Sequence, residues 1–215
     1  ISADEAGWTG TTNSDKHLVG VGADGVTIQN VTLDCNGKAY GLQGYEVTGM
    51  TLDNVTVLDS KGSGLTVNGS SVNATGLNIS GSAWGQSIDL SKGSGVETAA
   101  SLTLDSADGL SDARKIVEDK AQTATVTVGE KTWLAEKVYI PDGDDSYFKY
   151  VYSADVTAET ANDILVPAAG SADETGAYLQ TVIDAAADGA TIRLQDNVTI
   201  DAQIKLNKSI TLDGN

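Results

Sequence analysis

The chain has little of several residue types, and each shortage excludes a class of structure. One cysteine among 215 residues allows no internal disulfide. Two prolines and a single phenylalanine, beside 24 glycines, are typical of turn-rich β structure and not of a helical bundle. No apolar run reaches the roughly 18 residues that a membrane-spanning helix needs. We also see no signal peptide ahead of the first turns, so we expect a processed or excised segment.

Basic residues are also scarce. Thirteen Lys and Arg stand against 30 Asp and Glu, which gives a formal net charge of −17. Arginine occurs only at Arg114 and Arg193. Because phosphate binding depends on clustered Lys and Arg, we expect no nucleic acid as a partner. An anionic membrane surface is disfavoured for the same reason, and we expect no membrane partner.

Apolar residues recur along residues 17–105 with a period of about 23 residues, which indicates a repeat architecture. Within each turn they alternate with Thr, Ser, Asp or Asn, the pattern of a strand with one buried face. Gly and Asn fall between the strands, where corners need positive φ. The sequence therefore predicts a coil whose turns stack about 4.8 Å apart. Its four expected internal columns are Leu18, Leu42, Leu65 and Ile88; Val26, Met50, Val72 and Val96; Val31, Val55, Leu77 and Leu102; and Leu33, Val57, Ile79 and Leu104.

This repeat resembles the right-handed parallel β-helix of pectate-lyase-like proteins and of many large prokaryotic surface proteins. The resemblance covers residues 17–105 and returns at residues 178–215. It implies an all-β fold, a right-handed parallel β-helix solenoid with a small β-rich inserted module and a short α-helical cap. It implies little about function, since the fold hosts lyases, hydrolases, adhesins and inert stalks.

We expect three segments: coils in 1–109, the small inserted α+β or all-β module in 110–172, and a cap with first coils in 173–215. The inserted module should hold a short helix over 111–121 and antiparallel strands over 124–128, 133–140 and 147–152. In the last segment, residues 175–187 carry apolar residues at helical spacing, and strand patterns follow. That order is similar to the N-terminal cap and first coil of a β-helix.

The end of the sequence repeats the form of its beginning. Thr211-Leu212-Asp213 has the form of Thr32-Leu33-Asp34, Thr51-Leu52-Asp53 and Thr103-Leu104-Asp105. We therefore predict head-to-tail assembly, within one chain or, as we favour, between successive units. The 215 residues are then a tandem period or a separate subunit, and a piece cut from a larger protein is the remaining alternative. The expected contact residues are Ile204, Leu206, Ile210 and Leu212 on one side and Val26, Val31 and Leu33 on the other, with Ile210 and Leu212 continuing the columns of Val31 and Leu33.

Little in the sequence points to catalysis. Glycoside hydrolases related to the resembled family use a group of Asp residues with a Gly-His-Gly and an Arg-x-Lys element. Gly143-Asp144-Asp145 matches one fragment of that pattern, and the Gly-His-Gly and Arg-x-Lys elements have no counterpart in this sequence. The lone His17 cannot build a zinc site, and Cys35 has no base nearby. We expect no enzyme, no catalytic residue and no cofactor. Weak calcium binding by Asp142, Asp144 and Asp145 in a turn is the one metal candidate.

Two repeated features and two tryptophans suggest binding instead. Asn-x-Ser/Thr triplets are candidate glycan acceptors, at Asn30, Asn54, Asn68, Asn73, Asn78, Asn197 and Asn207. Trp8 and Trp84 are candidate platforms for sugars, or cover a neighbouring coil. Stacked threonines, Thr27 on Thr51 and Thr32 on Thr56, resemble the ice-binding faces of some β-helical antifreeze proteins, although ordinary solvent-facing positions explain them better.

These observations together favour a structural unit of an extracellular or cell-surface filament, stalk or fibre whose partner is itself. A carbohydrate-binding adhesin module, with a surface glycan as its partner, is the alternative. Polysaccharide lyase or hydrolase activity and ice binding are weaker alternatives.

Overall fold

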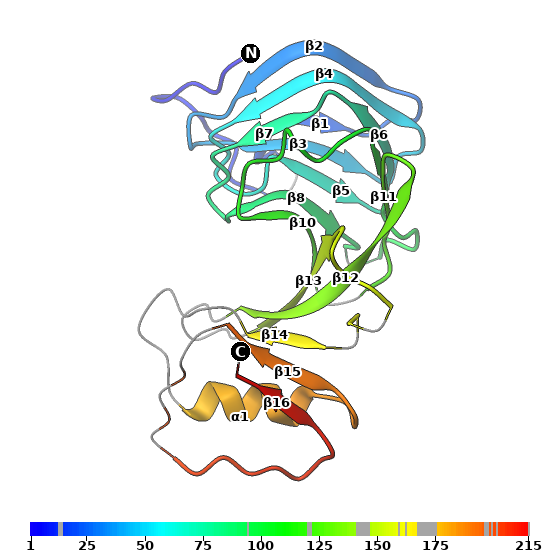
Figure 1. Ribbon diagram of the computed structural model, residues 1–215. Coiled ribbons are helices and arrows are strands. Elements are labelled where there is room, and N and C mark those ends of the chain that lie inside the picture. Colours follow the sequence, from blue (N-terminus) through cyan, green and yellow to red (C-terminus); the bar gives the residue numbers. More distant parts are fainter. Residues whose placement is uncertain are drawn as a thin grey trace. The chain divides into compact units, whose positions relative to one another are not determined.

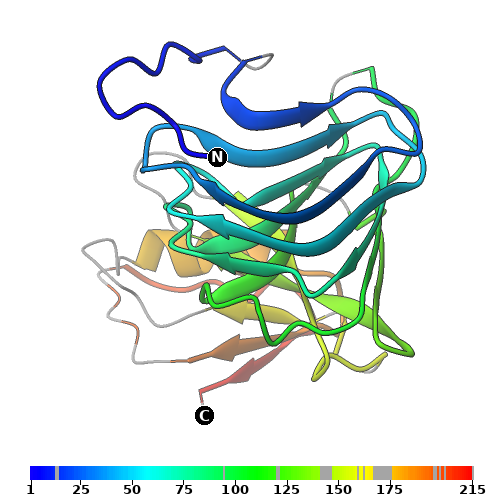
Figure 2. The ribbon, with the colours of Figure 1, turned by 90° about the horizontal axis from the view of Figure 1, so that it is seen from above.

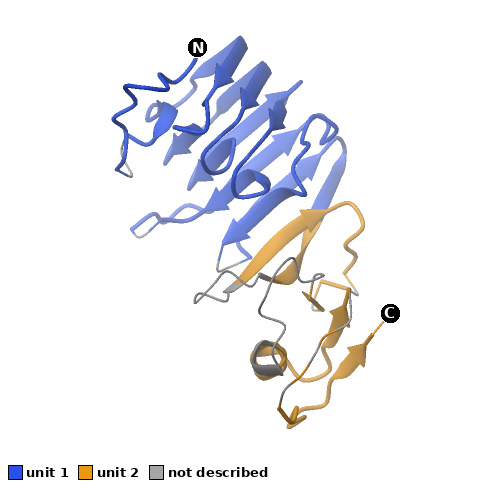
Figure 3. Cartoon of the chain, turned by 90° about the vertical axis from the view of Figure 1, so that its left-hand side faces the viewer, with its two compact units in different colours: residues 1–133 blue, residues 134–215 orange. Residues whose placement is uncertain are grey.

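The computed structural model describes residues 1–12, 15–93, 95–119, 122–140, 147–158, 160–161, 163–166, 176–195, 198, 200 and 202–214. The fold is all-β with one short helix, and its β-solenoid has about seven turns. The chain divides into two compact units, unit 1 with residues 1–133 and unit 2 with residues 134–215 (Figure 3). This division falls inside the segment 110–172, where the sequence suggested a separate module.

Unit 1 is a parallel β-helix built from two ladders of strands, and the chain alternates between them, so that one strand from each makes a coil (Figure 1). Neighbours within each ladder are parallel. The first ladder contains, in order, β1 (His17–Val21), β3 (Tyr40–Tyr45), β5 (Leu65–Asn68), β8 (Gln86–Ser91) and β10 (Arg114–Asp119). The second contains β2 (Thr27–Asp34), β4 (Met50–Leu58), β6 (Ser71–Thr75), β9 (Ser101–Leu104) and β11 (Thr125–Val128), with β7 (Asn78–Ser80) also on β4. The predicted parallel β-helix is confirmed.

The predicted internal column of the first ladder is confirmed from its second member onward. Leu42 stands beside Leu65, Leu65 beside Ile88 and Ile88 beside Ile116, and all four are fully buried. The prediction that Leu18 is the first member of this column was wrong, because Val19 and not Leu18 is opposite Leu42. A shift of one residue turns a strand's side chains to the other face, so Leu18 leaves the column.

The columns of the second ladder hold for three coils and then change. Val31 and Val55, and likewise Leu33 and Val57, pair as expected. In the next coils, however, Leu102 aligns with Val72, and Leu104 aligns with Ala74. The predicted places of Val96, Leu102 and Leu104 were therefore wrong, whereas Met50 with Val72 and Val57 with Ile79 pair as expected. The connection from β8 to β9 is longer than the one from β5 to β6, and a constant period cannot follow such a change.

The helix expected over 111–121 is also wrong, because residues 114–119 form strand β10. Ile116 and Val117 are fully buried there, and Ile116 extends the column of Leu42. β-Branched residues pack well on a pleated surface, and burial in the coil overrides a weak helical pattern.

Unit 2 continues with parallel strands and one antiparallel pair. β12 (Lys131–Ile140) begins in unit 1, where it pairs antiparallel with β11, and runs into unit 2, where it pairs antiparallel with β13 (Tyr147–Ser153). The expected antiparallel strands are thus confirmed, while their turn at 141–146 lies outside the described residues. β14 (Ile164–Val166), β15 (Thr191–Leu194) and β16 (Thr211–Asp213) follow as a parallel ladder on β12.

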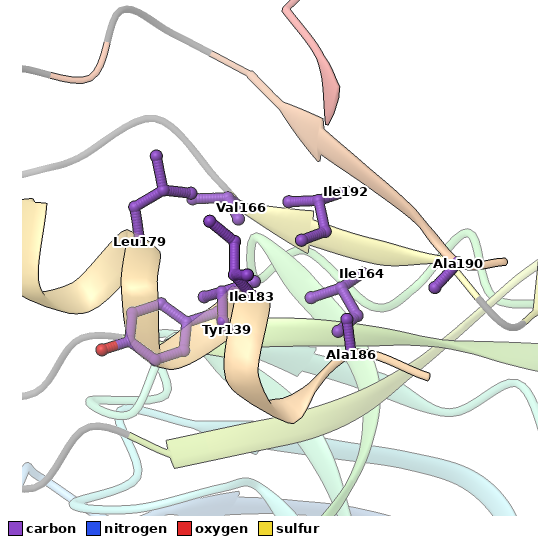
Figure 4. Close-up of a cluster of buried hydrophobic side chains, with 9 residues drawn as sticks. Tyr139, Ile164, Val166, Leu179, Ile183, Ala186, Ala190 and Ile192 are labelled. Carbon is purple, nitrogen blue, oxygen red and sulfur yellow. The ribbon is translucent and has the colours of Figure 1, made fainter. Parts of the chain in front are cut away.

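The expected helix of the last segment is present as α1 (Gly176–Ala185). Its apolar face packs against side chains of β12, β14 and β15 (Figure 4). Leu179, Val182 and Ile183 are buried there. The other members of this cluster are Tyr139, Ile164, Val166, Ala186, Ala190 and Ile192. Unit 2 therefore has an apolar core of its own.

Candidate functional site

A groove of about 410 Å³ lies on the outer face of the first ladder of unit 1. Outward-facing residues alternate with the buried column, so each coil contributes to the groove at the same spacing. One rank consists of Gln43, Thr66 and Asp89, which stand side by side in register. A second rank consists of Tyr45, Asn68 and Ser91. We call this site the ladder groove.

Aromatic rings form one rim of the ladder groove. The Trp84 ring packs edge-on against Tyr40 with 5.2 Å between centroids, and Tyr40 lies 5.6 Å from the His17 ring. Lys16 Nζ lies 4.5 Å from the centre of the Tyr40 ring. The chain passes under this ring at Gly62, where a Cβ would stand 2.2 Å from a ring carbon, so a side chain at this position would displace Tyr40. Tyr40 is therefore fixed in place, and Trp84 remains 43% exposed.

Polar groups in the ladder groove are held by hydrogen bonds within a coil and between neighbouring coils. Asp89 is only 9% exposed and accepts a hydrogen bond from Gln86 Nε2 at 3.3 Å. Asn68 Oδ1 accepts a hydrogen bond from the Gly93 amide at 2.9 Å, which fixes the amide of Asn68. His17 is also 9% exposed, and its Nε2 has no hydrogen-bond partner among the described residues.

Burial of His17, and secondarily the charge of Lys16, lowers the pKa of its imidazole from 6.5 to about 4. Below pH 6.5 the unfolded chain binds a proton that the folded chain does not, so stability falls between pH 6.5 and about 4. We expect His17 to lower the unfolding free energy, measured by urea titration, by an amount on the order of 3 kcal/mol across this pH range. The His17→Gln chain should lack this contribution. Equal pH dependence in both proteins would contradict this origin.

The two tryptophans predicted as sugar platforms have different places. Trp84 stands in the rim of the ladder groove, as described above. Trp8 does not line it, and its Nε1 donates a hydrogen bond at 2.9 Å to the Gly10 carbonyl within its own loop. Sequence reasoning missed Tyr40, Tyr45 and the rank of Gln43, although their 23-residue spacing beside the buried column was a readable signal.

The expected assembly residues fall on two separate surfaces. In unit 2, Leu206 and Leu212 are 55% and 41% exposed, while Ile204 and Ile210 are partly buried against the core cluster. Leu206, Leu212 and Ile204 line an apolar cavity of about 390 Å³. In unit 1, Val26 and Val31 are partly exposed in the first coil.

Leu33, by contrast, is fully buried, and residues of the same chain occupy the strand edge beside it. The Ile1 amino group donates to Thr32, the Asp34 amide donates to Ile1, and the Ala3 amide donates to Asp34. A strand cannot be added at this stretch of β2 while Ile1–Ala3 is there. Among the described strands, the first coil therefore leaves two edges unpaired, that of β1 and that of the preceding part of β2.

The predicted glycan acceptors lie mostly at exposed positions of unit 1. Asn30, Asn54, Asn73 and Asn78 are exposed, and so is Asn207 in unit 2, while Asn68 is partly buried and Asn197 lies outside the described residues. Asn30 and Asn54 have positive φ, and Asn54 Nδ2 donates to Asn30 Oδ1 at 2.9 Å. This amide ladder gives both residues a structural role at a bend within β2 and β4.

The expected threonine ranks are confirmed, and one is longer than the sequence suggested. Thr27 pairs with Thr51, and Thr32 pairs with Thr56. The first rank continues through Asn73, Thr103 and Thr127. The neighbouring outward rank includes Asp53 and is typical of a solvated, charged outer face.

The remaining chemical candidates give no site among the described residues. Asp142, Asp144 and Asp145 lie outside them, and the part that is described contains no group of three or more His, Cys, Asp or Glu side chains able to hold a metal ion. Cys35 is a fully buried free cysteine. Burial, followed by the charges of Asp34 and Asp59, raises the pKa of its thiol to about 12, so the thiol is neutral at ordinary pH.

Comparison with family models, with curated protein sequences and with solved structures gives no match for this chain. Among the described residues, no helix has the length and apolar character needed to cross a membrane. The structure thus establishes a β-solenoid of repeated coils, with an aromatic and polar groove on one face of unit 1 and exposed apolar residues in each unit.

Proposed function

We propose that the chain is a structural unit of an extracellular filament, stalk or surface fibre in which solenoids join head to tail by strand completion. The observation that carries the proposal is a pair of open ladder edges with exposed apolar side chains. At one end, β16 pairs only with β15; at the other, β1 pairs only with β3, within the part of the chain that the structure describes. Free strand edges are templates for pairing with another chain.

The side chains at these edges support a junction between β16 and β1. Leu212 is in register with the fully buried Ile192, so it belongs to an inward column, yet it is 41% exposed. Val19 is in register with the fully buried Leu42, yet it is only partly buried. Placing β16 of one copy beside β1 of the next would bury both residues in one continuous column.

The junction differs from the contact that the sequence suggested. Leu33 is not an available partner, because Ile1–Ala3 pairs with that part of β2. Val26 and Ile28, earlier in β2, remain partly exposed and can be covered by the incoming copy. An interface between two different surfaces gives a ring if its rotation closes and an open filament if it does not. Because strands added edge to edge extend the ladder in one direction, we expect repeated addition to give a linear filament.

The strongly acidic composition suits a surface fibre. A net charge of −17 keeps the outer face soluble and makes unrelated filaments repel each other. It also opposes junction formation at low ionic strength, because successive units repel. We therefore expect assembly to increase with added salt, which screens these charges.

Sedimentation velocity of the 215-residue chain tests the proposal. We expect species larger than a monomer to grow with protein concentration up to about 200 µM, and Leu212→Asp to remain monomeric throughout. Thr103→Asp adds the same charge at an exposed position away from both edges, and it should assemble like the unmodified chain. A chain that stays monomeric at the highest concentration, in low and high salt, would overturn the proposal.

A further inference from the structure

The ladder groove combines features that suit a particular ligand and that filament assembly does not use. Trp84 presents an exposed indole at the rim, next to the fixed ring of Tyr40. Asn68, Asp89 and Thr66 present hydrogen-bonding groups across the floor. An aromatic face beside convergent polar groups matches a molecule with both apolar C–H faces and hydroxyl groups.

We propose that the ladder groove binds a neutral oligosaccharide, with a sugar ring stacked against Trp84 and its hydroxyls bonded to Asn68 and Asp89. The proposal goes beyond the structural role above and does not depend on it.

The charge of the groove indicates a neutral ligand. Its described lining contains one cation, Lys16, and one carboxylate, Asp89, beside neutral residues. Lys16 also lies over the Tyr40 ring, so its charge is directed partly to the protein. The net charge of −17 repels polyanions at long range. Acidic polysaccharides are therefore poor ligands.

The length of the groove indicates an oligomer and not a single sugar. Its ranks cross β3, β5 and β8, and His17 extends the rim to β1. Four strands span about 14 Å across the ladder, which exceeds the length of one sugar ring. A ligand lying along the ranks would contact the same positions in successive coils.

The groove supports binding without cleavage. Glycoside hydrolases use two carboxyl groups on either side of the scissile bond, about 5 to 10 Å apart. Among the described residues that line this groove, Asp89 is the single carboxylate. Its hydrogen bond from Gln86 Nε2 gives it a positioning partner within the protein.

Isothermal titration with defined hexasaccharides tests the proposal on the full chain. The probes are β-1,4-linked hexamers of glucose, xylose and N-acetylglucosamine, the α-1,4-linked hexamer of glucose, and hexagalacturonate as the anionic probe. We expect at least one neutral hexamer to bind with a Kd between about 10 µM and 1 mM. Trp84→Ala and Asn68→Ala should weaken that binding at least about tenfold.

Trp8→Ala is the matched control, because it removes a tryptophan outside the groove and should leave the Kd unchanged. If Trp84→Ala does not give the circular dichroism of the unmodified chain, Tyr45→Ala replaces it, because Tyr45 is an exposed residue of the same groove. The absence of binding by all four neutral hexamers at about 5 mM would overturn the proposal. Tighter binding of hexagalacturonate, or equal binding by the groove variants, would also overturn it.

Discussion

Replacing Leu65 by aspartate will leave unit 1 largely unfolded at room temperature. Leu65 is fully buried between Leu42 and Ile88 in the column that joins successive coils. A carboxyl group there has no polar partner in the column, and its burial costs several kcal/mol in either protonation state. Truncation alone, as in Leu65→Ala, should cost about 2 to 5 kcal/mol. Both losses are large against a typical domain stability of about 5 to 15 kcal/mol.

Urea unfolding followed by circular dichroism measures this effect. Thr103→Asp is the control, because it places the same charge on an exposed, outward position of β9 and should change stability by no more than about 0.5 kcal/mol. A Leu65→Asp chain within about 0.5 kcal/mol of the unmodified one would mean that the register of the first ladder is wrong.

Val182→Asp will unfold unit 2 while the coils of unit 1 stay folded. Val182 is fully buried in α1 and belongs to the cluster that contains Ile164 and Ile192. Figure 4 labels these two isoleucines within the cluster. Each unit has its own apolar core, so loss of one core does not remove the inward columns of the other. Hydrogen exchange should show fast exchange in β14 and β15 with protection retained in β3, β5 and β8.

Thr181→Asp is the matched control for this variant, since the neighbouring side chain on α1 is exposed. It should keep unit 2 protected. Loss of protection in both units of Val182→Asp would show that they unfold as one, and unchanged protection in unit 2 would contradict the packing of α1.

The sequence was sufficient to predict the solenoid because its signal is repeated. Each coil places an apolar residue at the same inward position, so Leu42, Leu65 and Ile88 identify both the period and the buried face. Where the length of a connection changes, the period is lost. This is why Val96 was placed in a column that Leu102 occupies. The placement of Leu18 in the first column was wrong because the register differs by one residue, and such a shift exchanges the two faces of a strand.

The ladder groove could be predicted only in part. Trp84 was identified by its residue type, whereas the groove depends on which outward positions become neighbours across coils. Gln43, Thr66 and Asp89 each follow a residue of the inward column by one position. The predicted register of that column could therefore have given their alignment. The depth of the groove and the packing of Tyr40 over Gly62 depend on three-dimensional contacts that no local pattern records.

For a similar reason, the recurrent tripeptide is a weak guide to the assembly contact. The recurrence of Thr-Leu-Asp suggested that Leu212 continues the column of Leu33. In the structure, Thr32 is in register with Thr56, whereas Thr51 is in register with Thr27, so equal tripeptides occupy different positions of the coil. Figure 2 looks onto the N-terminal end of the stack, where β1 and β2 are nearest the viewer and Ile1–Ala3 runs beside β2. We therefore propose β1 as the partner edge for β16.

Disulfide trapping between copies tests this junction most directly. A chain carrying both Val19→Cys and Leu212→Cys places the two new thiols on neighbouring strands of the proposed junction, within the roughly 4.4 to 6.8 Å Cα separation that a disulfide requires. The native Cys35 is fully buried and stays as an internal reference. Under mild oxidation we predict a ladder of covalent oligomers on denaturing gels, while Gly20→Cys with Leu212→Cys, whose thiols face opposite sides, gives far less. Monomer alone from the first pair, or equal ladders from both, would contradict head-to-tail assembly through β16 and β1.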